Sequence, residues 1–308
     1  MNSARPRIPL PGPFAALLDD ADVIEICVNP DGAVFVERFG AGWSNWGDLA
    51  AAEAEGFLRW CATRNHTSIT EDSPCLKARL PGTAHRVAGL IPPVVAAPSF
   101  TIRRHLDRVI ALGAFLPDPE PRAILGKALR ARRNIVIAGA TGSGKTTLLN
   151  ACLDEIADIA PETRLVSIED TPEIRTRLIN RVQMQASGTT GMDALLSETL
   201  RHAPTRIVLG EVRAGHVLMT LLKAWHTGHP GGLVTLHANS AHEVMDRLWT
   251  LGTEVMASDP TPALMQATDM IVFLRRGAGA PELTTILARP DSASGRSRET
   301  RLETVYEI

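Results

Sequence analysis

The stretch Asn134-Ile-Val-Ile-Ala-Gly-Ala-Thr-Gly-Ser-Gly-Lys-Thr146 sets the fold class of this chain. It begins as a short apolar run, which is typical of a buried strand. It continues into Gly139-Ala-Thr-Gly-Ser-Gly-Lys-Thr146, which matches the phosphate-loop pattern G-x-x-x-x-G-K-T at every position. Residues 146–157 then show helical periodicity. A strand, a glycine loop and a helix in this order predict a phosphate-binding loop within an α/β domain.

The residue types of this loop suit a nucleotide. Glycines let main-chain N–H groups surround phosphate oxygens, and the N-terminus of the following helix adds positive potential. Lys145 is expected to reach the β- and γ-phosphates of ATP, and the Thr146 hydroxyl to hold Mg²⁺. A chance glycine turn is the alternative, and the chain has only four lysines with which to produce one. The predicted nucleotide-binding residues are Gly139, Ala140, Thr141, Gly142, Ser143, Gly144, Lys145, Thr146 and Thr147.

Short apolar strands and helices alternate after the loop. The expected strands are Leu165–Ile168, Arg181–Gln185, Arg206–Leu209, Gly232–Leu236 and Met270–Leu274, and the expected helices cover 191–201, 217–225 and 241–255. This alternation predicts a parallel sheet with helical crossovers, which binds its ligands at the carboxyl ends of the strands. We expect residues 292–299 to form an exposed connection.

Three polar groups stand at the predicted carboxyl ends of these strands. Glu169-Asp170 could orient or deprotonate an attacking water, Glu211 could hold Mg²⁺ through water, and a neutral His237 could sense the γ-phosphate. The alternatives are solvated turn acids for the first group, a helix cap for Glu211 and a hydrogen-bonded structural role for His237. The order of loop, acid, acid and histidine favours the catalytic interpretation.

The N-terminal part has a different pattern. Strand-like runs at Val23–Val28 and Ala33–Glu37 flank the turn Asn29-Pro-Asp-Gly32, and Ala51–Arg64 has the spacing of a helix. Further short strands are expected between residues 76 and 102. We therefore predict an α+β domain over 1–106, a Pro-rich linker over 107–121 that includes three prolines between 116 and 122, and an ATPase domain over 122–308.

Composition excludes several classes of protein. The 308 residues are 44% hydrophobic and 21% charged with a net charge of −2, which suits a soluble globular protein without sequence-specific nucleic-acid binding. The four cysteines form no C-x-x-C pair, which argues against a zinc site and a disulfide framework. The early prolines argue against a signal peptide. The longest uncharged stretch, Val87–Ile102, is too short to cross a bilayer, so we expect a cytoplasmic protein with no transmembrane segment.

These motifs together resemble the secretion-ATPase superfamily, which powers type II secretion, type IV secretion and type IV pili. Its four signatures occur in order: the phosphate loop at 139–146, the Asp box Ile168-Glu-Asp-Thr-Pro-Glu173, the Walker B segment Arg206-Ile-Val-Leu-Gly-Glu-Val-Arg213, and the His box around His237. Residues 222–241 are most similar to the TrbB-type conjugal-transfer ATPases. The resemblance covers residues 120–275 strongly and the N-terminal part weakly, through residues 98–104.

The resemblance implies a RecA-like core, a PAS-like N-terminal domain and a homo-hexameric ring that hydrolyses ATP with Mg²⁺. It also implies partners among the channel proteins of the inner membrane, where the protein would be peripheral. The implied catalytic residues are Glu169 as general base, Glu211 as the Mg²⁺-linked acid, His237 of the His box, and Arg103 or Arg104 reaching the nucleotide. Simple solvation is the alternative for Arg103 and Arg104, and Arg86 and Arg213 are further candidates.

The chain departs from the family pattern in two respects. Pro204-Thr205 stands where the family often has Pro-Asp, and a tetracysteine zinc motif is missing. Three other functions remain open from the sequence: a type IV pilus assembly or retraction motor, a nucleotide-switched scaffold with negligible hydrolysis, and a helicase. The helicase would need a basic pore, which the composition does not suggest.

Overall fold

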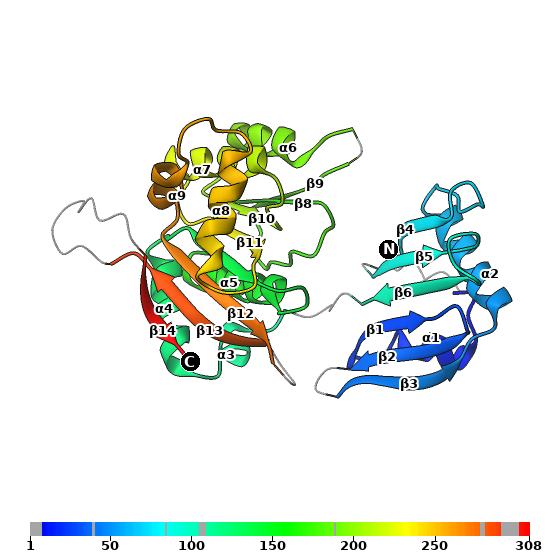
Figure 1. Ribbon diagram of the computed structural model, residues 1–308. Coiled ribbons are helices and arrows are strands. Elements are labelled where there is room, and N and C mark those ends of the chain that lie inside the picture. Colours follow the sequence, from blue (N-terminus) through cyan, green and yellow to red (C-terminus); the bar gives the residue numbers. More distant parts are fainter. Residues whose placement is uncertain are drawn as a thin grey trace. The chain divides into compact units, whose positions relative to one another are not determined.

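The computed structural model describes residues 8–38, 41–83, 85–104, 109–187, 189–277, 281–290 and 302–308. These residues form two compact units that divide between residues 104 and 109 (Figure 1). The first unit contains an antiparallel sheet with two helices. The second contains a larger, mostly parallel sheet with helices on both faces. This agrees with the predicted fold class, a RecA-like α/β core preceded by a smaller α+β unit.

The first unit has a six-stranded sheet in the order β3-β2-β1-β6-β5-β4. Its elements are α1 (Gly12–Leu17), β1 (Val23–Val28), β2 (Ala33–Arg38), β3 (Gly42–Asp48), α2 (Ala51–Arg64), β4 (Cys75–Arg79), β5 (Arg86–Leu90) and β6 (Ser99–Arg103). Its core joins alternate strand residues to the helices; the rings of Phe57 in α2 and Phe100 in β6 lie 4.7 Å apart. The helices thus cover one face of the sheet.

The second unit has an eight-stranded sheet in the order β14-β13-β12-β7-β11-β10-β8-β9. Its helices are α3 (Leu112–Phe115), α4 (Pro119–Arg130), α5 (Lys145–Ile159), α6 (Met192–Thr199), the 3₁₀ helix η1 (Leu200–His202), α7 (Gly215–His226), α8 (Glu243–Thr253) and α9 (Thr261–Ala267). Its strands are β7 (Ile135–Gly139), β8 (Leu165–Glu169), β9 (Arg181–Gln185), β10 (Arg206–Leu209), β11 (Leu233–His237), β12 (Met270–Arg276), β13 (Pro281–Ala288) and β14 (Glu303–Glu307). The strands from β12 to β9 are parallel, and β13 and β14 extend the sheet antiparallel at one edge.

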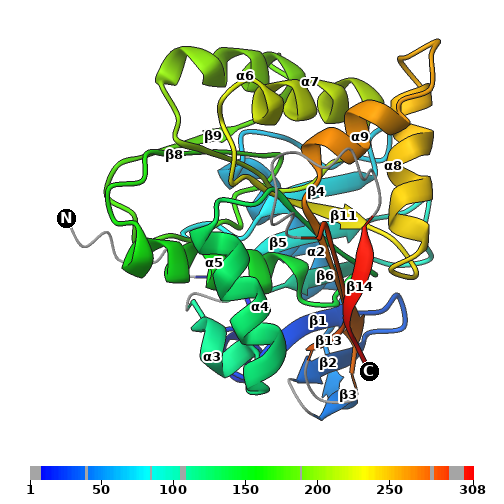
Figure 2. The same cartoon turned by 90° about the vertical axis from the view of Figure 1, so that its left-hand side faces the viewer.

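Two apolar cores sandwich this sheet because successive strand residues point to opposite faces. In β7, Ile135 and Ile137 pack with α3, α4 and α5, whereas Val136 and Ala138 pack with α6, α7, α8 and α9. Both views show these two helical layers on opposite sides of the sheet (Figure 1 and Figure 2). Burial on both faces explains why these strands are apolar at nearly every position. Because these strands are parallel, their carboxyl ends lie at one edge of the sheet.

The expected strands and helices are present, with ends that shift by a few residues. Sequence patterns missed the edge strands β3 and β14, and also β13, which lies between β12 and β14; all three carry polar residues or glycine. The Pro-rich stretch also differs from an extended connection, because Pro119 begins α4 and Asp118 caps it by accepting the N–H of Glu120. The predicted linker boundaries, 107–121, stay a prediction. Residues 292–299 lie outside the described residues.

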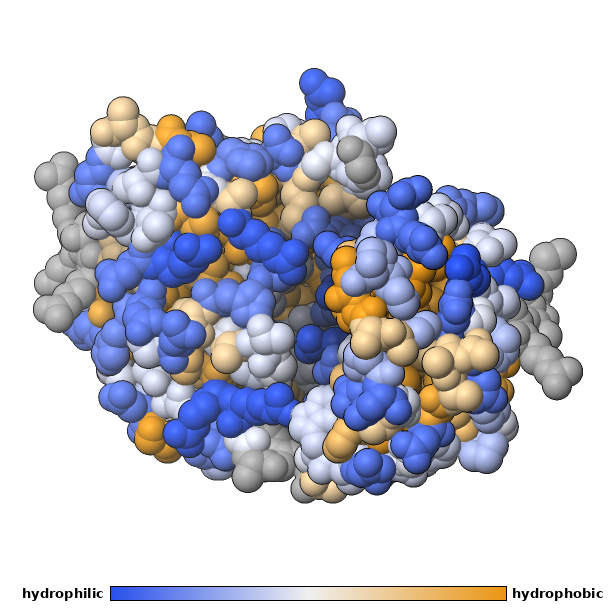
Figure 3. Space-filling model, turned by 45° about the vertical axis from the view of Figure 1, so that its right-hand side comes forward, coloured by the Kyte–Doolittle hydropathy of each residue, from blue (hydrophilic) through white to orange (hydrophobic). Residues whose placement is uncertain are grey.

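No helix in the described part of the chain is long and apolar enough to cross a membrane. The face drawn in Figure 3 is mainly hydrophilic, with apolar side chains in small groups.

Candidate functional site

The phosphate loop connects β7 to α5, as its sequence predicts. Gly142 and Gly144 have φ angles of +73° and +88°, in the left-handed region that glycine adopts most easily. A Cβ on Gly144 would also lie 2.5 Å from Cγ of Pro281. Both glycines are therefore required by the conformation of the loop.

The loop has the features of an anion site. The 15-residue helix α5, all of which is described, has neither a side-chain N-cap nor an acidic residue in its first turn. Its first N–H groups are therefore available to an anion, and the helix dipole favours negative charge there. Ser143 Oγ is buried and has no hydrogen-bond partner among the described residues. These observations fit the phosphate groups of a nucleotide.

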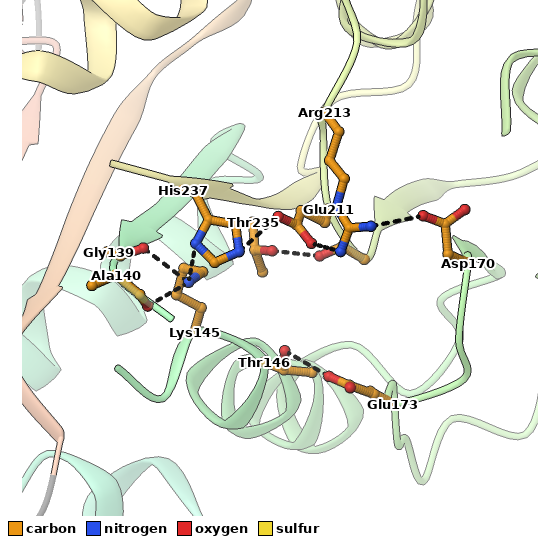
Figure 4. A network of polar contacts seen from close by, with 11 residues as sticks. Gly139, Ala140, Lys145, Thr146, Asp170, Glu173, Glu211, Arg213, Thr235 and His237 are labelled. Carbon is orange, nitrogen blue, oxygen red and sulfur yellow. Dashed lines mark hydrogen bonds and ion pairs between the residues drawn. The ribbon is translucent and has the colours of Figure 1, made fainter. Parts of the chain in front are cut away.

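Lys145 lies at the centre of this site (Figure 4). Its side chain is buried, and its Nζ donates hydrogen bonds to the carbonyl oxygens of Gly139 (2.9 Å) and Ala140 (2.7 Å). The same Nζ lies 3.3 Å from Nδ1 of His237. The ammonium group is thus held at the mouth of the loop by two main-chain oxygens and one imidazole.

The order of the strands places His237 beside the loop. β11 lies directly next to β7, and His237 pairs in register with Gly139. The next strand, β10, is followed by Glu211, and Val212 donates its N–H to the carbonyl of Thr235 at 3.1 Å. This main-chain bond fastens the segment after β10 to β11, so that Glu211 is held beside His237.

A continuous chain of polar contacts runs from Lys145 to the end of β8 (Figure 4). His237 Nε2 lies 2.9 Å from Oε1 of Glu211, and Oε2 of Glu211 accepts a 2.6 Å hydrogen bond from Nη2 of Arg213. Nη1 of Arg213 lies 3.5 Å from Oδ2 of Asp170. The hydrogen bond to Glu211 raises the pKa of Arg213, and the nearby carboxylates of Glu211, Asp170 and Glu173 act in the same direction.

These contacts select one form of the imidazole. A lysine ammonium can only donate, so Nδ1 of His237 acts as the acceptor of its contact with Lys145. The proton then belongs on Nε2, which faces the acceptor Oε1 of Glu211. A neutral His237 protonated at Nε2 is the form that suits both contacts, and the role of this histidine stays a prediction.

Glu169 stands further from the loop than its place in the chain suggests. β11 and β10 separate its strand, β8, from β7. Its carboxylate is buried, and Oε1 accepts the N–H groups of Glu173 (2.8 Å) and Ile174 (2.9 Å). In these contacts Glu169 holds the loop that follows β8.

The loop after β8 brings a different acid to the site. Oε2 of Glu173 accepts a 3.2 Å hydrogen bond from Oγ1 of Thr146, the residue expected to hold Mg²⁺. Two oxygen groups at this point suit a hard cation such as Mg²⁺. Glu173 closes the Asp box, but its nearness to the loop could not be read from the pattern. Among the described residues, no group of three or more His, Cys, Asp or Glu side chains could hold a metal by themselves.

The candidate arginines of the N-terminal part lie in the first unit. Nη1 of Arg104 donates to the carbonyl oxygens of Asp20 and, at 2.8 Å, of Val23. Arg103 is exposed and pairs across the sheet with Arg86, which in turn pairs with Arg79. Arg104 therefore fastens the start of β1, while the aligned arginines form a cationic row on the sheet face opposite the helices.

A hollow of ≈ 590 Å³ adjoins the loop in the second unit. Its lining includes Ala140 and Thr141 of the loop, His237 of β11, and Glu243, Asp246 and Arg247 of α8. The loop thus borders open space on the side of α8.

A parallel sheet with a phosphate loop, a histidine and acids at its carboxyl edge defines the class of P-loop nucleotide hydrolases. A family model described as type II/IV secretion system protein matches residues 76–276. The chain belongs to this family and is an ATPase of it.

Relatives and solved structures agree with this assignment. The probable conjugal transfer protein TrbB of Sinorhizobium fredii is 42% identical over 283 residues, covering 91% of this chain and 87% of that protein. The type IV secretion system protein VirB11 of Bartonella quintana is 30% identical, covering 90% and 91%. The ATPase DotB of Legionella pneumophila superposes with a TM-score of 0.69 at 19% identity, covering 94% and 83% of the two chains, which shows the shared fold.

Proposed function

We propose that this chain is the ATP-hydrolysing motor of a conjugal DNA-transfer system of the type IV secretion kind. The observation that carries this proposal is the contact chain from Lys145 through His237 and Glu211 to Arg213, which links the phosphate loop to the ends of two further strands. Relatives named for conjugal transfer and type IV secretion support the biological setting.

In this proposal the loop residues 139–147 bind the phosphates of ATP. Lys145 exchanges its contacts with Gly139 and Ala140 for phosphate oxygens, because an ammonium group pairs more strongly with an anion than with a neutral carbonyl. Mg²⁺, held through Thr146 with Glu211 and Glu173 nearby, would neutralise phosphate charge. His237 remains joined to Glu211.

The general base needs a carboxylate close to the phosphates. The sequence assigned this role to Glu169, whose Oε1 is occupied by two main-chain N–H groups. We assign it instead to Glu173, because its carboxylate lies at Thr146 in the first turn of α5. Glu211 keeps its predicted role as the Mg²⁺-linked acid, and His237 keeps that of the His-box residue.

The motor would act as a homo-hexameric ring on channel proteins of the inner membrane. It would lie in the cytoplasm and be bound to the membrane through those proteins. Arg103 and Arg86 remain candidates to stabilise phosphate charge, since arginine is a common device in phosphoryl transfer. The side chain of Arg104 is already hydrogen-bonded to two carbonyls of its own unit.

Phosphate release by the purified protein tests the enzymatic part. We expect turnover with Mg-ATP that falls by about 10²–10⁴-fold in Glu173→Gln, as removal of a general base does. Lys145→Ala should abolish nucleotide binding. Equal, near-zero release by the wild type and Glu173→Gln would instead support a nucleotide-switched scaffold.

The biological role needs a second experiment. A strain lacking this protein should lose plasmid transfer in mating assays and regain it with the wild type but not with Lys145→Ala. Loss of pilus retraction with normal mating would favour the pilus motor. Electron microscopy with a non-hydrolysable ATP analogue should show six-membered rings; monomers would contradict the ring.

A further inference from the structure

Asn150 is a buried polar residue in the middle of α5. Only 7% of it is exposed, and its helix neighbours Leu149 and Ala151 belong wholly to the core. Asparagine is a poor residue for a helix interior, and a buried amide is unfavourable unless its groups are hydrogen-bonded. The residue therefore requires a specific set of partners.

Both halves of the Asn150 amide bind the loop after β8. Nδ2 donates to the carbonyl oxygen of Glu173 at 3.0 Å, and Oδ1 accepts the N–H of Arg175 at 2.9 Å. One planar amide thus pairs with the C=O of one residue and the N–H of the second residue beyond it, much as a neighbouring strand would. Aspartate, leucine or alanine could not supply both the donor and the acceptor.

The spacing on the helix links this clamp to the phosphate loop. Asn150 follows Thr146 by four residues, so the two side chains lie on the same face of α5, one turn apart. Glu173 spans this turn, with its carboxylate at Oγ1 of Thr146 and its carbonyl at Nδ2 of Asn150. Its N–H is bound by Glu169. The N–H, the carbonyl oxygen and Oε2 of Glu173 therefore each have a partner that holds the residue in place.

We propose that Asn150 is a positioning residue that holds the main chain of residues 173–175 against α5 and so keeps the Glu173 carboxylate at Thr146. This inference rests on the proposed function, in which Glu173 is the general base. Small displacements of a catalytic group can lower a rate by about 10²-fold, so the clamp has a measurable consequence.

Two substitutions remove the clamp to different extents. Asn150→Leu keeps the approximate volume and removes both hydrogen bonds. Asn150→Asp keeps the acceptor for Arg175 but places a carboxylate oxygen against the carbonyl of Glu173. Ala151→Gly is the matched control, because it weakens the same helix at a buried position whose side chain has no hydrogen-bonding group.

Steady-state kinetics and amide hydrogen exchange test whether Asn150 positions Glu173. We expect kcat to fall about 10- to 100-fold in Asn150→Leu, less in Asn150→Asp, and under about twofold in Ala151→Gly. Amide exchange at Arg175 should accelerate by at least about tenfold in Asn150→Leu, while the nucleotide Kd changes little. In a Glu173→Gln background, Asn150→Leu should cause no further loss of kcat, because the group that it positions is already gone.

Several results would overturn the inference. One is a kcat in Asn150→Leu within twofold of the wild type. Another is a kcat loss from Asn150→Leu that is as large in the Glu173→Gln background as in the wild type. If Asn150→Leu does not fold, Asn150→Asp carries the same comparisons. If the wild type hydrolyses no ATP, the proposed function fails. Separately, unchanged amide exchange at Arg175 in Asn150→Leu would show that Asn150 does not hold residues 173–175 in place.

Discussion

Nζ of Lys145 and Nδ1 of His237 lie 3.3 Å apart, although 92 positions separate the two residues in the chain. Parallel pairing of β7 with β11 makes this contact, because it sets His237 level with Gly139 at the same edge of the sheet. The contact joins the lysine that identifies the loop to the histidine of the His box.

Replacing His237 should slow hydrolysis without unfolding the protein. The ring is half exposed, so His237→Ala removes its contacts with Lys145 and Glu211 and little core packing. We expect kcat to fall by about 10- to 100-fold, as for other losses of a positioning contact. His226→Ala, at the exposed end of α7, is the control. Equal turnover in the two variants would exclude a role for His237.

Glu169 can be tested by separating its charge from its hydrogen-bond acceptor. Glu169→Gln keeps an oxygen that can accept the N–H groups of Glu173 and Ile174, so phosphate release should stay within about threefold of the wild type. Glu169→Ala leaves those groups unpaired and should lower the free energy of unfolding by about 1–3 kcal/mol. A loss of 10²-fold or more in Glu169→Gln would restore it as the general base.

Arg104 should contribute to the stability of the first unit, and its neighbour Arg103 should contribute little. Arg104→Leu removes the hydrogen bonds to the carbonyls of Asp20 and Val23, and we expect a loss of about 1.5–3 kcal/mol from the first unit. The exposed Arg103 is the matched site, where leucine should change stability by less than about 0.5 kcal/mol. Urea unfolding measures both. A loss of nucleotide affinity without a loss of stability in Arg104→Leu would place Arg104 at the nucleotide.

The four cysteines should differ sharply in reactivity. Burial raises the pKa of the Cys61 thiol to about 12, and it also raises that of the fully buried Cys152. With a pKa near 12, only about one Cys61 thiol in 10⁴ is ionised at pH 8, and the thiolate is the reactive form. Cys75 is exposed. Timed alkylation followed by mass spectrometry should modify Cys75 first, and rapid labelling of Cys61 would contradict the fold of the first unit.

Asp259 should make the stability of α9 depend on acidic pH. Hydrogen bonds from Thr261, with a further one from Trp249, hold the pKa of Asp259 below its usual value. A lowered folded-state pKa stabilises the protein above the unfolded pKa of about 4 and loses that effect as pH falls through the folded value. Asp259→Ala should therefore melt below the wild type at pH 7, and the difference should shrink below about pH 4. Asp259→Asn, which keeps an acceptor, should show a smaller difference, and Trp249 fluorescence reports the contact.

Much of the fold could be predicted because its signals are local. The run Ile135–Ala138 is apolar on both faces, and only a buried strand uses such a run next to a glycine loop. Edge strands were missed because a strand with one open side does not need apolar residues at every position. β3, for example, carries Gly42, Ser44 and Asn45 and contains no continuous apolar run. Pro119 was assigned to the linker, and in the structure it begins α4; proline fits both a stiff connection and the first turn of a helix.

The sequence by itself determined the phosphate loop, the strands beside it and the residue types at their carboxyl ends, because backbone geometry and apolar periodicity act over a few residues. Only the tertiary structure decided which strands are neighbours. In the sheet β11 lies next to β7, and β11 and β10 separate β8 from β7. His237 therefore adjoins Lys145, whereas Glu169 holds the loop after β8. It also set Asn150 and Thr146 against Glu173. Such contacts depend on how whole strands and helices pack, and no pattern within a short window contains that information.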